Sequence, residues 1–163
     1  MKKNSIAIIV PVILLFSSCN NEKKCTDLPT TQKTDTIFPK GEKVANNNFV
    51  GTVYLHPMIT PDSVYNTQVG NVTFQPGARS NWHYHPGGQI LLAIGGTGYY
   101  QEKGSTLKIL RKGDVVKCPP NVLHWHGAGP DDQFIQVAIT NAQYGPTVWL
   151  EKVSDEEYSS IKK

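Results

Sequence analysis

Short apolar and alternating runs, separated by Gly, Pro, Asn and Asp, occupy most of the chain from residue 49 onward. This pattern is typical of short β-strands joined by turns. It predicts nine strands, at residues 50–55, 68–74, 81–85, 89–94, 98–102, 106–110, 114–118, 123–126 and 134–140. Near the C-terminus Ser154 can cap a helix, because Glu157 lies three residues further on, as in a capping box. We therefore expect an all-β sandwich or barrel with a short C-terminal helix.

The first residues carry the pattern of an export signal rather than of a strand. Lys2 and Lys3 precede an apolar run over residues 6–16, and small residues follow before Cys19. The run is shorter than the about 20 residues that a transmembrane helix needs. The Phe-Ser-Ser-Cys sequence that ends at Cys19 resembles a bacterial lipoprotein cleavage box, which implies a lipoprotein signal peptide at residues 1–18 and a lipid on Cys19. The mature chain would then be anchored to the membrane by this lipid in the cell envelope, as a periplasmic or outer-membrane protein.

The remaining chain divides into a polar stretch and one domain. Residues 19–43 are rich in Lys, Asn, Thr, Asp and Pro and have no apolar period, so we expect a flexible tether. Residues 44–160 are long enough for one domain with its own core and leave little room for a second. Of the 16 basic residues, removal of Lys2 and Lys3 with the signal leaves 14 against 13 acidic ones. This balance gives no support to nucleic-acid binding.

Four of the five histidines stand in two His-x-His pairs, which is the strongest chemical signal in the sequence. Side chains two apart in a strand share a face, so His83 and His85 project together, and so do His124 and His126. After a Pro-Gly-Gly turn, Gln89 can direct its amide oxygen toward the first pair. A single histidine on an apolar face is usually a packed core residue, but two such pairs favour a metal site.

These residues also resemble the two sequence motifs of the cupin family. The first motif is Gly77, five residues, His83-x-His85, three residues, Gln89, six residues and Gly96, with Gln in place of the commoner Glu. The second is Gly113, five residues, Pro119 and then His124, with Asn121 in place of a glycine and Ala128 in place of an asparagine. The resemblance implies that residues 44–160 form a cupin jelly-roll β-barrel.

Within the cupins, the chain resembles small single-domain members that include bacterial manganese-dependent hydroxynitrile lyases. The similarity runs through residues 49–53, 74–79, 82–86, 113–116, 124–128 and 149–158. The metal ligands that it implies are His83, His85, Gln89 and His124. It also implies one divalent metal ion, Mn(II) with Fe(II), Ni(II) or Zn(II) as alternatives, and a homodimer or higher homo-oligomer. A histidine often found inside the barrel falls at Gln136 here, and together with Gly70 and Val72 we expect Gln136 to line a substrate pocket.

Three neutral imidazoles and one amide would leave the full charge on a divalent metal ion, which favours Lewis-acid work on an oxygen of a bound small molecule. His126 shares a face with His124 and is not needed as a ligand, so it is the candidate general base, or else a packing residue beside the metal. In the hydroxynitrile lyase chemistry that the resemblance implies, His126 or a metal-bound hydroxide removes the proton of a cyanohydrin hydroxyl and cyanide leaves. We therefore expect a metal-dependent lyase for a small hydroxyl or carbonyl compound. An iron-dependent dioxygenase and a non-catalytic envelope protein that binds a small ligand or a metal remain the alternatives.

Overall fold

The computed structural model describes residues 36–45 and 47–160. The expected signal peptide, the lipidation site Cys19 and most of the expected tether lie outside these residues, so the membrane anchor and the cell-envelope location stay predictions. Within the described ranges, no helix has the length and the apolar character needed to cross a membrane.

Twelve strands and one helix are found in the described part of the chain. The strands are Glu42–Lys43 (β1), Phe49–Val50 (β2), Val53–Ile59 (β3), Thr67–Phe74 (β4), Arg79–Ser80 (β5), His83–Tyr84 (β6), Gln89–Glu102 (β7), Lys108–Arg111 (β8), Val115–Cys118 (β9), His124–Ala128 (β10), Phe134–Asn141 (β11) and Val148–Trp149 (β12). Helix α1 spans Asp155–Ser159 and has the predicted capping box, since Glu157 N donates to Ser154 Oγ (3.1 Å) and Ser154 N donates to Glu157 Oε2 (2.9 Å). The expected all-β architecture with a short C-terminal helix is confirmed.

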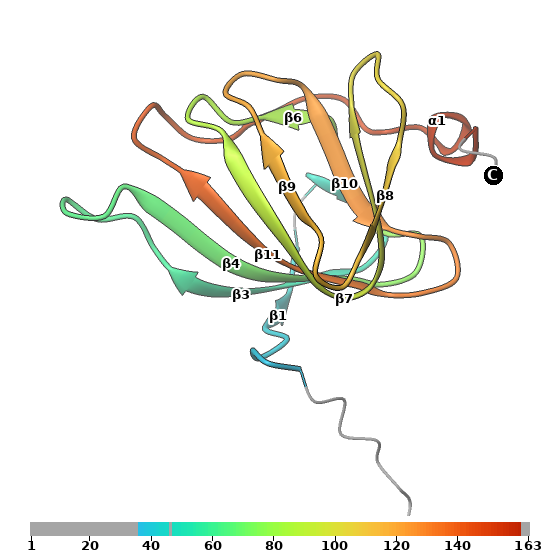
Figure 1. The fold of residues 1–163 in the computed structure, drawn as a ribbon, viewed down its shortest axis with the longest axis horizontal. Helices are drawn as coiled ribbons and strands as arrows, with labels where there is room; N and C mark the ends of the chain where they lie inside the picture. The colour runs from blue at the N-terminus through green and yellow to red at the C-terminus, as the bar shows by residue number, and fades with distance from the viewer. Residues whose placement is uncertain (1–35, 46, 161–163) are drawn as a thin grey trace, which may run out of the picture. The chain divides into compact units, whose positions relative to one another are not determined.

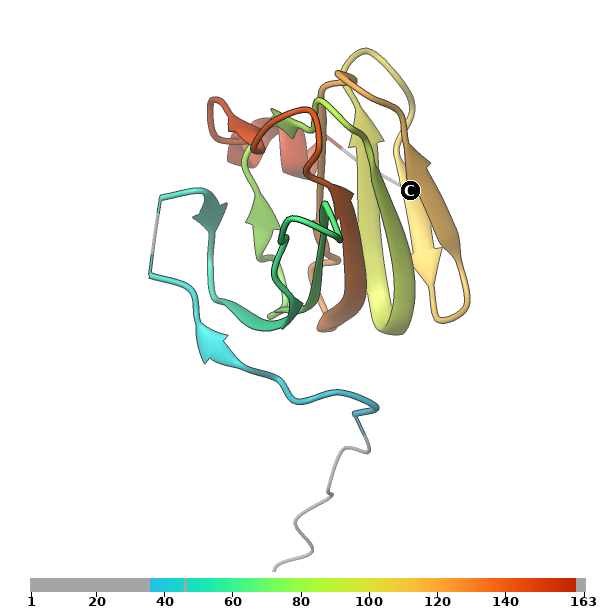
Figure 2. The ribbon, with the colours of Figure 1, turned by 90° about the vertical axis from the view of Figure 1, so that its left-hand side faces the viewer.

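The strands form one antiparallel sheet that curls on itself. Its order is β1-β3-β4-β11-β7-β10-β5-β2, with β8 and β9 paired to β7 and with β6 between β10 and β12. The long strand β7 belongs to both halves of the sheet, because its first part pairs with β11 and β9 and its last part, from Gly98 onward, pairs with β10. Figure 1 shows β3, β4, β11 and β7 side by side, and the turned view of Figure 2 shows the curl.

A run of glycines lets β7 bend from one half of the sheet to the other. Gly96 has a positive φ of 70°, and a Cβ there would lie 1.8 Å from Gln133 O. A Cβ on Gly98 would lie 2.5 Å from the ring of Phe134. The two strands predicted here are therefore one continuous strand, because the glycines let the ladder continue round the bend instead of ending it.

Two other predicted strands are divided differently in the structure. The run at residues 50–55 separates at Gly51, whose φ is 80°, into β2 and β3, which pair with different partners. Of residues 81–85 only two form β6, because the N–H groups of Asn81 and Trp82 donate to loop carbonyls instead. The remaining five predicted strands agree with β4, β8, β9, β10 and β11 to within two residues at each end.

The tether was expected to extend to Lys43, but the folded part of the chain begins before that residue. Glu42–Lys43 form β1 and pair with β3. Before them, Pro39 O accepts a hydrogen bond from Asn71 Nδ2 (2.8 Å), so the chain already contacts β4 there. Without β1, the edge of β3 would have backbone N–H and C=O groups with no strand to pair with. The polar segment pairs with this edge for that reason, although its composition gives no strand signal.

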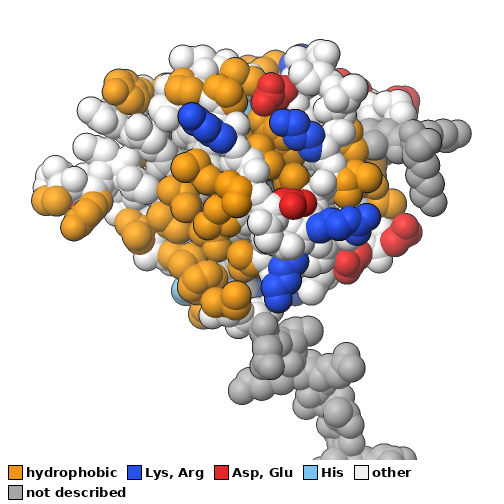
Figure 3. All heavy atoms as spheres, in the orientation of Figure 1, with side chains coloured by type: hydrophobic (Ala, Val, Ile, Leu, Met, Phe, Trp, Pro, Cys, Tyr) orange, Lys and Arg blue, Asp and Glu red, His pale blue; other side chains and the backbone are white. Residues whose placement is uncertain are grey.

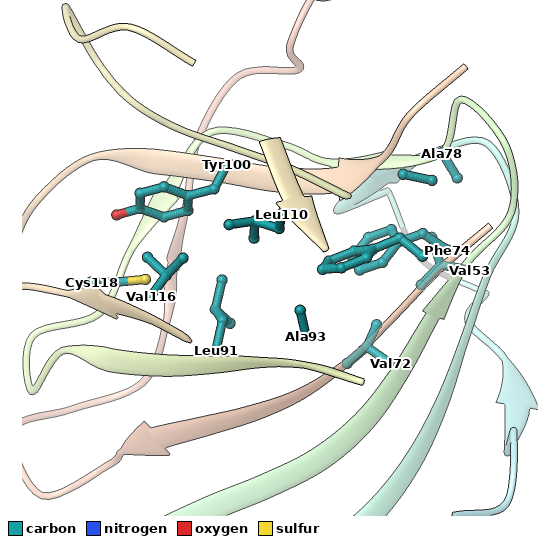
Figure 4. Close-up of a cluster of buried hydrophobic side chains, with 12 residues drawn as sticks. Val53, Val72, Phe74, Ala78, Leu91, Ala93, Tyr100, Leu110, Val116 and Cys118 are labelled. Carbon is teal, nitrogen blue, oxygen red and sulfur yellow. The ribbon is translucent and has the colours of Figure 1, made fainter. Parts of the chain in front are cut away.

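Two clusters of apolar side chains hold the sheet together. The larger one fills the inside of the curl (Figure 4) and contains Val53, Val72, Phe74, Ala78, Leu91, Ala93, Tyr100, Leu110, Val116, Cys118, Ala128 and Phe134. In the smaller one Trp82 and Trp125 pack with Val153, on the face opposite the histidines of the same segments, because neighbouring side chains in a strand alternate between its faces. Buried Arg79 fastens this C-terminal segment by donating to Val153 O (3.0 Å) and to Asp155 Oδ1 (2.6 Å).

The outer face of β11, β7 and β9 is mostly apolar, with Lys117 opposite Ile90. Val137 and Ile139 stand beside Leu92 and Ile90, and Val115 continues the row. Ile90 and Val115 are 41% and 64% exposed. Figure 3 shows hydrophobic side chains gathered on this side of the molecule. Apolar patches of this kind commonly mark protein contacts, and this face is a suitable surface for the homo-oligomer that the resemblance implies. The homo-oligomer itself stays a prediction.

The glycine bend gives a test of the fold. Gly96→Ala should lower the free energy of unfolding by about 1–3 kcal/mol more than Gly104→Ala, because the added methyl group collides with the Gln133 carbonyl. Gly104 is the matched control, since it also has a positive φ, of 80°, but no atom within 4 Å of a Cβ. Urea unfolding of both variants measures the difference. Equal stabilities would mean that the close contact at Gly96 does not constrain the fold.

Candidate metal centre

Two neighbouring strands bring three of the predicted metal ligands together. Strands β6 and β10 are antiparallel, and His83 lies directly opposite His124, with ring centroids 4.4 Å apart. His85 follows just after β6, with its ring centroid 5.5 Å from that of His124. One ring nitrogen of each of these buried histidines lies within 4.8 Å of the other two. Three imidazoles at this spacing can hold a divalent metal ion.

The turn before β10 fixes the backbone of His85. Asn121 has a φ of 61°, in the left-handed region that glycine and asparagine tolerate best. The N–H of Asn121 and the N–H of Gly88 both donate to His85 O, each at 3.0 Å. The replacement of a motif glycine by Asn121 therefore keeps the turn, and the turn holds His85 in place.

Hydrogen bonds at Nδ1 decide which nitrogen of each ring faces the site. His83 Nδ1 lies 2.9 Å from Asn81 O, and His124 Nδ1 lies 2.8 Å from Val122 O. A carbonyl oxygen only accepts hydrogen bonds, so each Nδ1 carries the proton and each Nε2 keeps its lone pair. Both rings are thus held in the tautomer that can ligate a metal through Nε2.

Three buried atoms of the predicted ligands have no hydrogen-bond partner among the described residues. They are His85 Nε2, His124 Nε2 and Gln89 Oε1. Gln89, at the start of β7, donates from Nε2 to Thr140 Oγ1 (3.0 Å), which leaves its amide oxygen free. Buried lone pairs without a partner are costly, and a divalent cation would satisfy all three. The predicted ligand set, completed by His83, fits such an ion, although its assignment stays a prediction.

All four histidines of the two pairs are held in the neutral form. Burial, together with the neighbouring His124, lowers the pKa of His83 well below its ordinary value of 6.5. The same two causes lower the pKa of His85 to about 4. Burial also lowers the pKa of His124, and lowers that of His126 well below 6.5. Neutral imidazole is the form that binds a metal ion, so these rings need no deprotonation at neutral pH.

His126 lies beside the three-histidine cluster rather than in it. Its ring centroid is 5.2 Å from that of His83, and its Nε2 is buried with no hydrogen-bond partner in the described part of the chain. Its Nδ1 lies 3.0 Å from Nε2 of the fully buried Gln136 amide. An amide group carries both a donor and an acceptor, so Gln136 can pair with either neutral tautomer of His126. While Gln136 Nε2 donates to Nδ1, the Nε2 of His126 carries the hydrogen and can donate it; once the amide turns and Oε1 accepts from Nδ1, that Nε2 can accept a proton.

A cavity of about 110 Å³ opens beside the histidines. Its lining consists of Phe49, Leu55, Gln68, Gly70, Val72, His83, His85, Gln89, His126, Ala138, Thr140, Thr147 and Trp149. The predicted pocket residues Gly70 and Val72 do line this cavity. Gln136, predicted as a third pocket residue, does not line it, because its side chain is fully buried and its amide is paired with the ring of His126.

Sequence reasoning missed several residues of the cavity wall. Ala138 and Thr140 lie two and four residues after Gln136 on β11, so the period of two along a strand could have indicated them. Trp149 belongs to β12 and Thr147 directly precedes it; Trp149 lies within the resemblance to the small cupins, but nothing in the sequence assigns either residue to the cavity. Their place at the site arises because β12 pairs with β6.

Comparisons with known proteins cover the same part of the chain. A family model described as Cupin domain matches residues 70–137. The (R)-mandelonitrile lyase of Granulicella tundricola is 40% identical over 111 residues, which are 68% of this chain and 85% of that protein. The crystal structure of a cupin-like protein from Thermotoga maritima is 47% identical, with a TM-score of 0.77 over 79% of this chain and 98% of that one. A cupin 2 conserved barrel domain protein from Rhodopseudomonas palustris, 18% identical, shares the fold with a TM-score of 0.56 over 73% of this chain and 78% of that one.

The neutral state of the buried histidines predicts a pH dependence for the metal-free protein. Unfolded, each histidine takes up a proton near pH 6.5, whereas His83 and His126 stay neutral in the folded chain. Stability should therefore be full above about pH 6.5 and fall below it, by up to about 1.4 kcal/mol per pH unit for each such histidine. Denaturant unfolding between about pH 7.5 and pH 5 measures the slope. The same stability at both ends of this range would contradict a neutral, buried cluster.

Proposed function

We propose a function for this chain, which belongs to the cupin family. It is a metal-dependent lyase that acts on a small hydroxyl or carbonyl compound, in the manner of a hydroxynitrile lyase. The observation that carries this proposal is a cluster of three buried imidazoles, two of which line one small cavity together with His126. The similarity to an (R)-mandelonitrile lyase supports the same class of reaction.

The proposed metal is Mn(II), held by His83, His85, His124 and the amide oxygen of Gln89, with Fe(II), Ni(II) and Zn(II) as the alternatives. When bound, such a cation supplies Lewis-acid polarisation of a hydroxyl or carbonyl oxygen. None of the four side chains is charged, so the full charge of the cation acts on that oxygen. Among the described residues, the cluster contains no carboxylate, which favours this role over the site of two histidines and one carboxylate that is typical of iron oxygenases.

His126 is the proposed proton acceptor. In cyanohydrin cleavage the hydroxyl proton passes to His126 Nε2, the carbon–carbon bond to cyanide breaks with its electron pair on cyanide, and the hydroxyl carbon becomes a carbonyl carbon. For the protonated ring, the Gln136 amide has to turn so that Oε1, in place of Nε2, faces His126 Nδ1 and accepts its hydrogen, which keeps the ring oriented. Because burial disfavours the charged imidazole, His126 returns the proton to the departing cyanide.

The apolar part of the cavity is the proposed seat for the rest of the substrate. Its wall is formed by Phe49, Leu55, Val72, Ala138 and Trp149. A cavity of about 110 Å³ accommodates only a small molecule. Apolar walls also exclude water, and this strengthens the electrostatic interactions at the reacting oxygen.

Cleavage of mandelonitrile by the full chain tests the proposed reaction. The chain loaded with Mn(II) should release benzaldehyde at the same rate in air and without oxygen. Turnover that requires oxygen would instead favour the iron-dependent dioxygenase. Metal binding without cleavage of mandelonitrile or acetone cyanohydrin would favour the non-catalytic binding protein.

His126→Ala should separate the proton role from metal binding. We expect kcat to fall roughly 10²- to 10⁴-fold, as is usual for the loss of a general acid–base group, with the metal content unchanged. His124→Ala should instead lose most of the metal. His56→Ala is the matched control and should change neither quantity, since His56 lies on β3 and does not line the cavity. Release of the metal by His126→Ala would make His126 a ligand and contradict the proposed roles.

A further inference from the structure

Side chains orient two of the four proposed ligands, whereas the backbone orients the other two. The Nδ1 atoms of His83 and His124 each face a carbonyl two residues earlier in the chain. For His85 the partner is a side chain, since its Nδ1 lies 3.0 Å from Thr147 Oγ1. Thr147 is 62 residues away in sequence, so the orientation of this ring depends on a different segment of the chain.

A second threonine stands at the other end of the same loop. Gln89 Nε2 donates to Thr140 Oγ1 (3.0 Å) near the end of β11, and Thr147 directly precedes β12. We call residues 140–147 the clasp. Its first residue, Thr140, and its last, Thr147, each make a hydrogen bond to a proposed ligand. Both threonines also line the cavity.

The ends of the clasp are fixed and its middle is open to solvent. Asn141 N donates to Gly88 O (3.3 Å), in the turn between His85 and Gln89. A Cβ on Gly87 would lie 2.3 Å from Asn141 O, so the two backbones touch. In the middle of the clasp Tyr144 is 66% exposed. A segment of this kind can open locally without unfolding the sheet.

The geometry points to the clasp as the element that positions His85 and Gln89 for the metal, so that metal binding and the order of the clasp are coupled. This inference rests on the proposed metal centre. The Thr147 hydroxyl can accept the hydrogen of His85 Nδ1, and in that tautomer the Nε2 of the ring presents its lone pair to the metal. Because Thr140 Oγ1 accepts from the amide nitrogen, Gln89 presents its oxygen. An ion that holds these two ligands also holds the clasp, and this coupling is reciprocal.

Thr147→Val removes the hydroxyl group and keeps the shape of the side chain. We expect the affinity of the metal-stripped full chain for Mn²⁺ to fall roughly 10- to 100-fold, as is usual when the partner of a ligating histidine is lost. Thr147→Ser keeps the acceptor and should restore most of the affinity. Thr97→Val, on β7 and outside the cavity lining, is the matched control and should bind as the unsubstituted chain does. Titration with Mn²⁺, followed by electron paramagnetic resonance, measures all four proteins. The metal-free Thr147→Val protein should stay folded and unfold only a few degrees lower than the unsubstituted chain, because it loses one part-buried hydrogen bond and no part of the sheet.

Hydrogen exchange tests the coupling itself. Mn²⁺ should slow the exchange of amides at residues 141–147, and not of those at residues 131–133, which connect β10 and β11. Two results would contradict the role of the clasp without contradicting the metal centre. One is equal Mn²⁺ affinity of the Thr147→Val and unsubstituted chains, and the other is unchanged hydrogen exchange in the clasp when Mn²⁺ binds. If the unsubstituted chain binds neither Mn²⁺ nor Zn²⁺, the proposed metal centre is wrong and the clasp with it.

Discussion

Polar atoms buried at the edge of an apolar cavity need partners, and the site is arranged around this constraint. His85 Nε2, His124 Nε2 and Gln89 Oε1 are all buried without one among the described residues. Each unpaired atom of this kind costs on the order of 1–3 kcal/mol. The same burial holds the imidazoles neutral by lowering their pKa values. A divalent cation would supply the missing partners, and neutral imidazoles are the form that binds it.

The fold brings these atoms together by curling one sheet around them. The pairing of β6 with β10 sets His83 opposite His124, and the bend of β7 at its glycines carries the strand that begins at Gln89 over to β10. The C-terminal segment then crosses the outside, where Arg79 fastens it, and β12 pairs with β6. This crossing places Thr147 against His85, so part of the site depends on a segment that follows the barrel strands in sequence.

Features that depend on neighbours in sequence could be predicted, and features that depend on distant contacts could not. Motif spacing indicated the histidine cluster, and alternation and capping signals indicated most strands and the helix. The continuity of β7 was missed because it depends on a contact between residues far apart in sequence: the carbonyl of Gln133 leaves room only for a glycine at position 96. The pairing of Glu42–Lys43 depends on a free strand edge and not on composition. Gln136 was expected in the cavity, but its pairing with His126 places it behind that ring.

The most direct measurement of the central claim is a crystal structure of the full chain loaded with Mn(II), with anomalous scattering used to locate the metal. The account predicts one peak, roughly 2 Å from the Nε2 atoms of His83, His85 and His124 and from Oε1 of Gln89. It also predicts that His126 Nε2 stays unligated at the cavity. A peak bonded to His126 in place of one of the four ligands, or no peak at the cluster, would contradict the account.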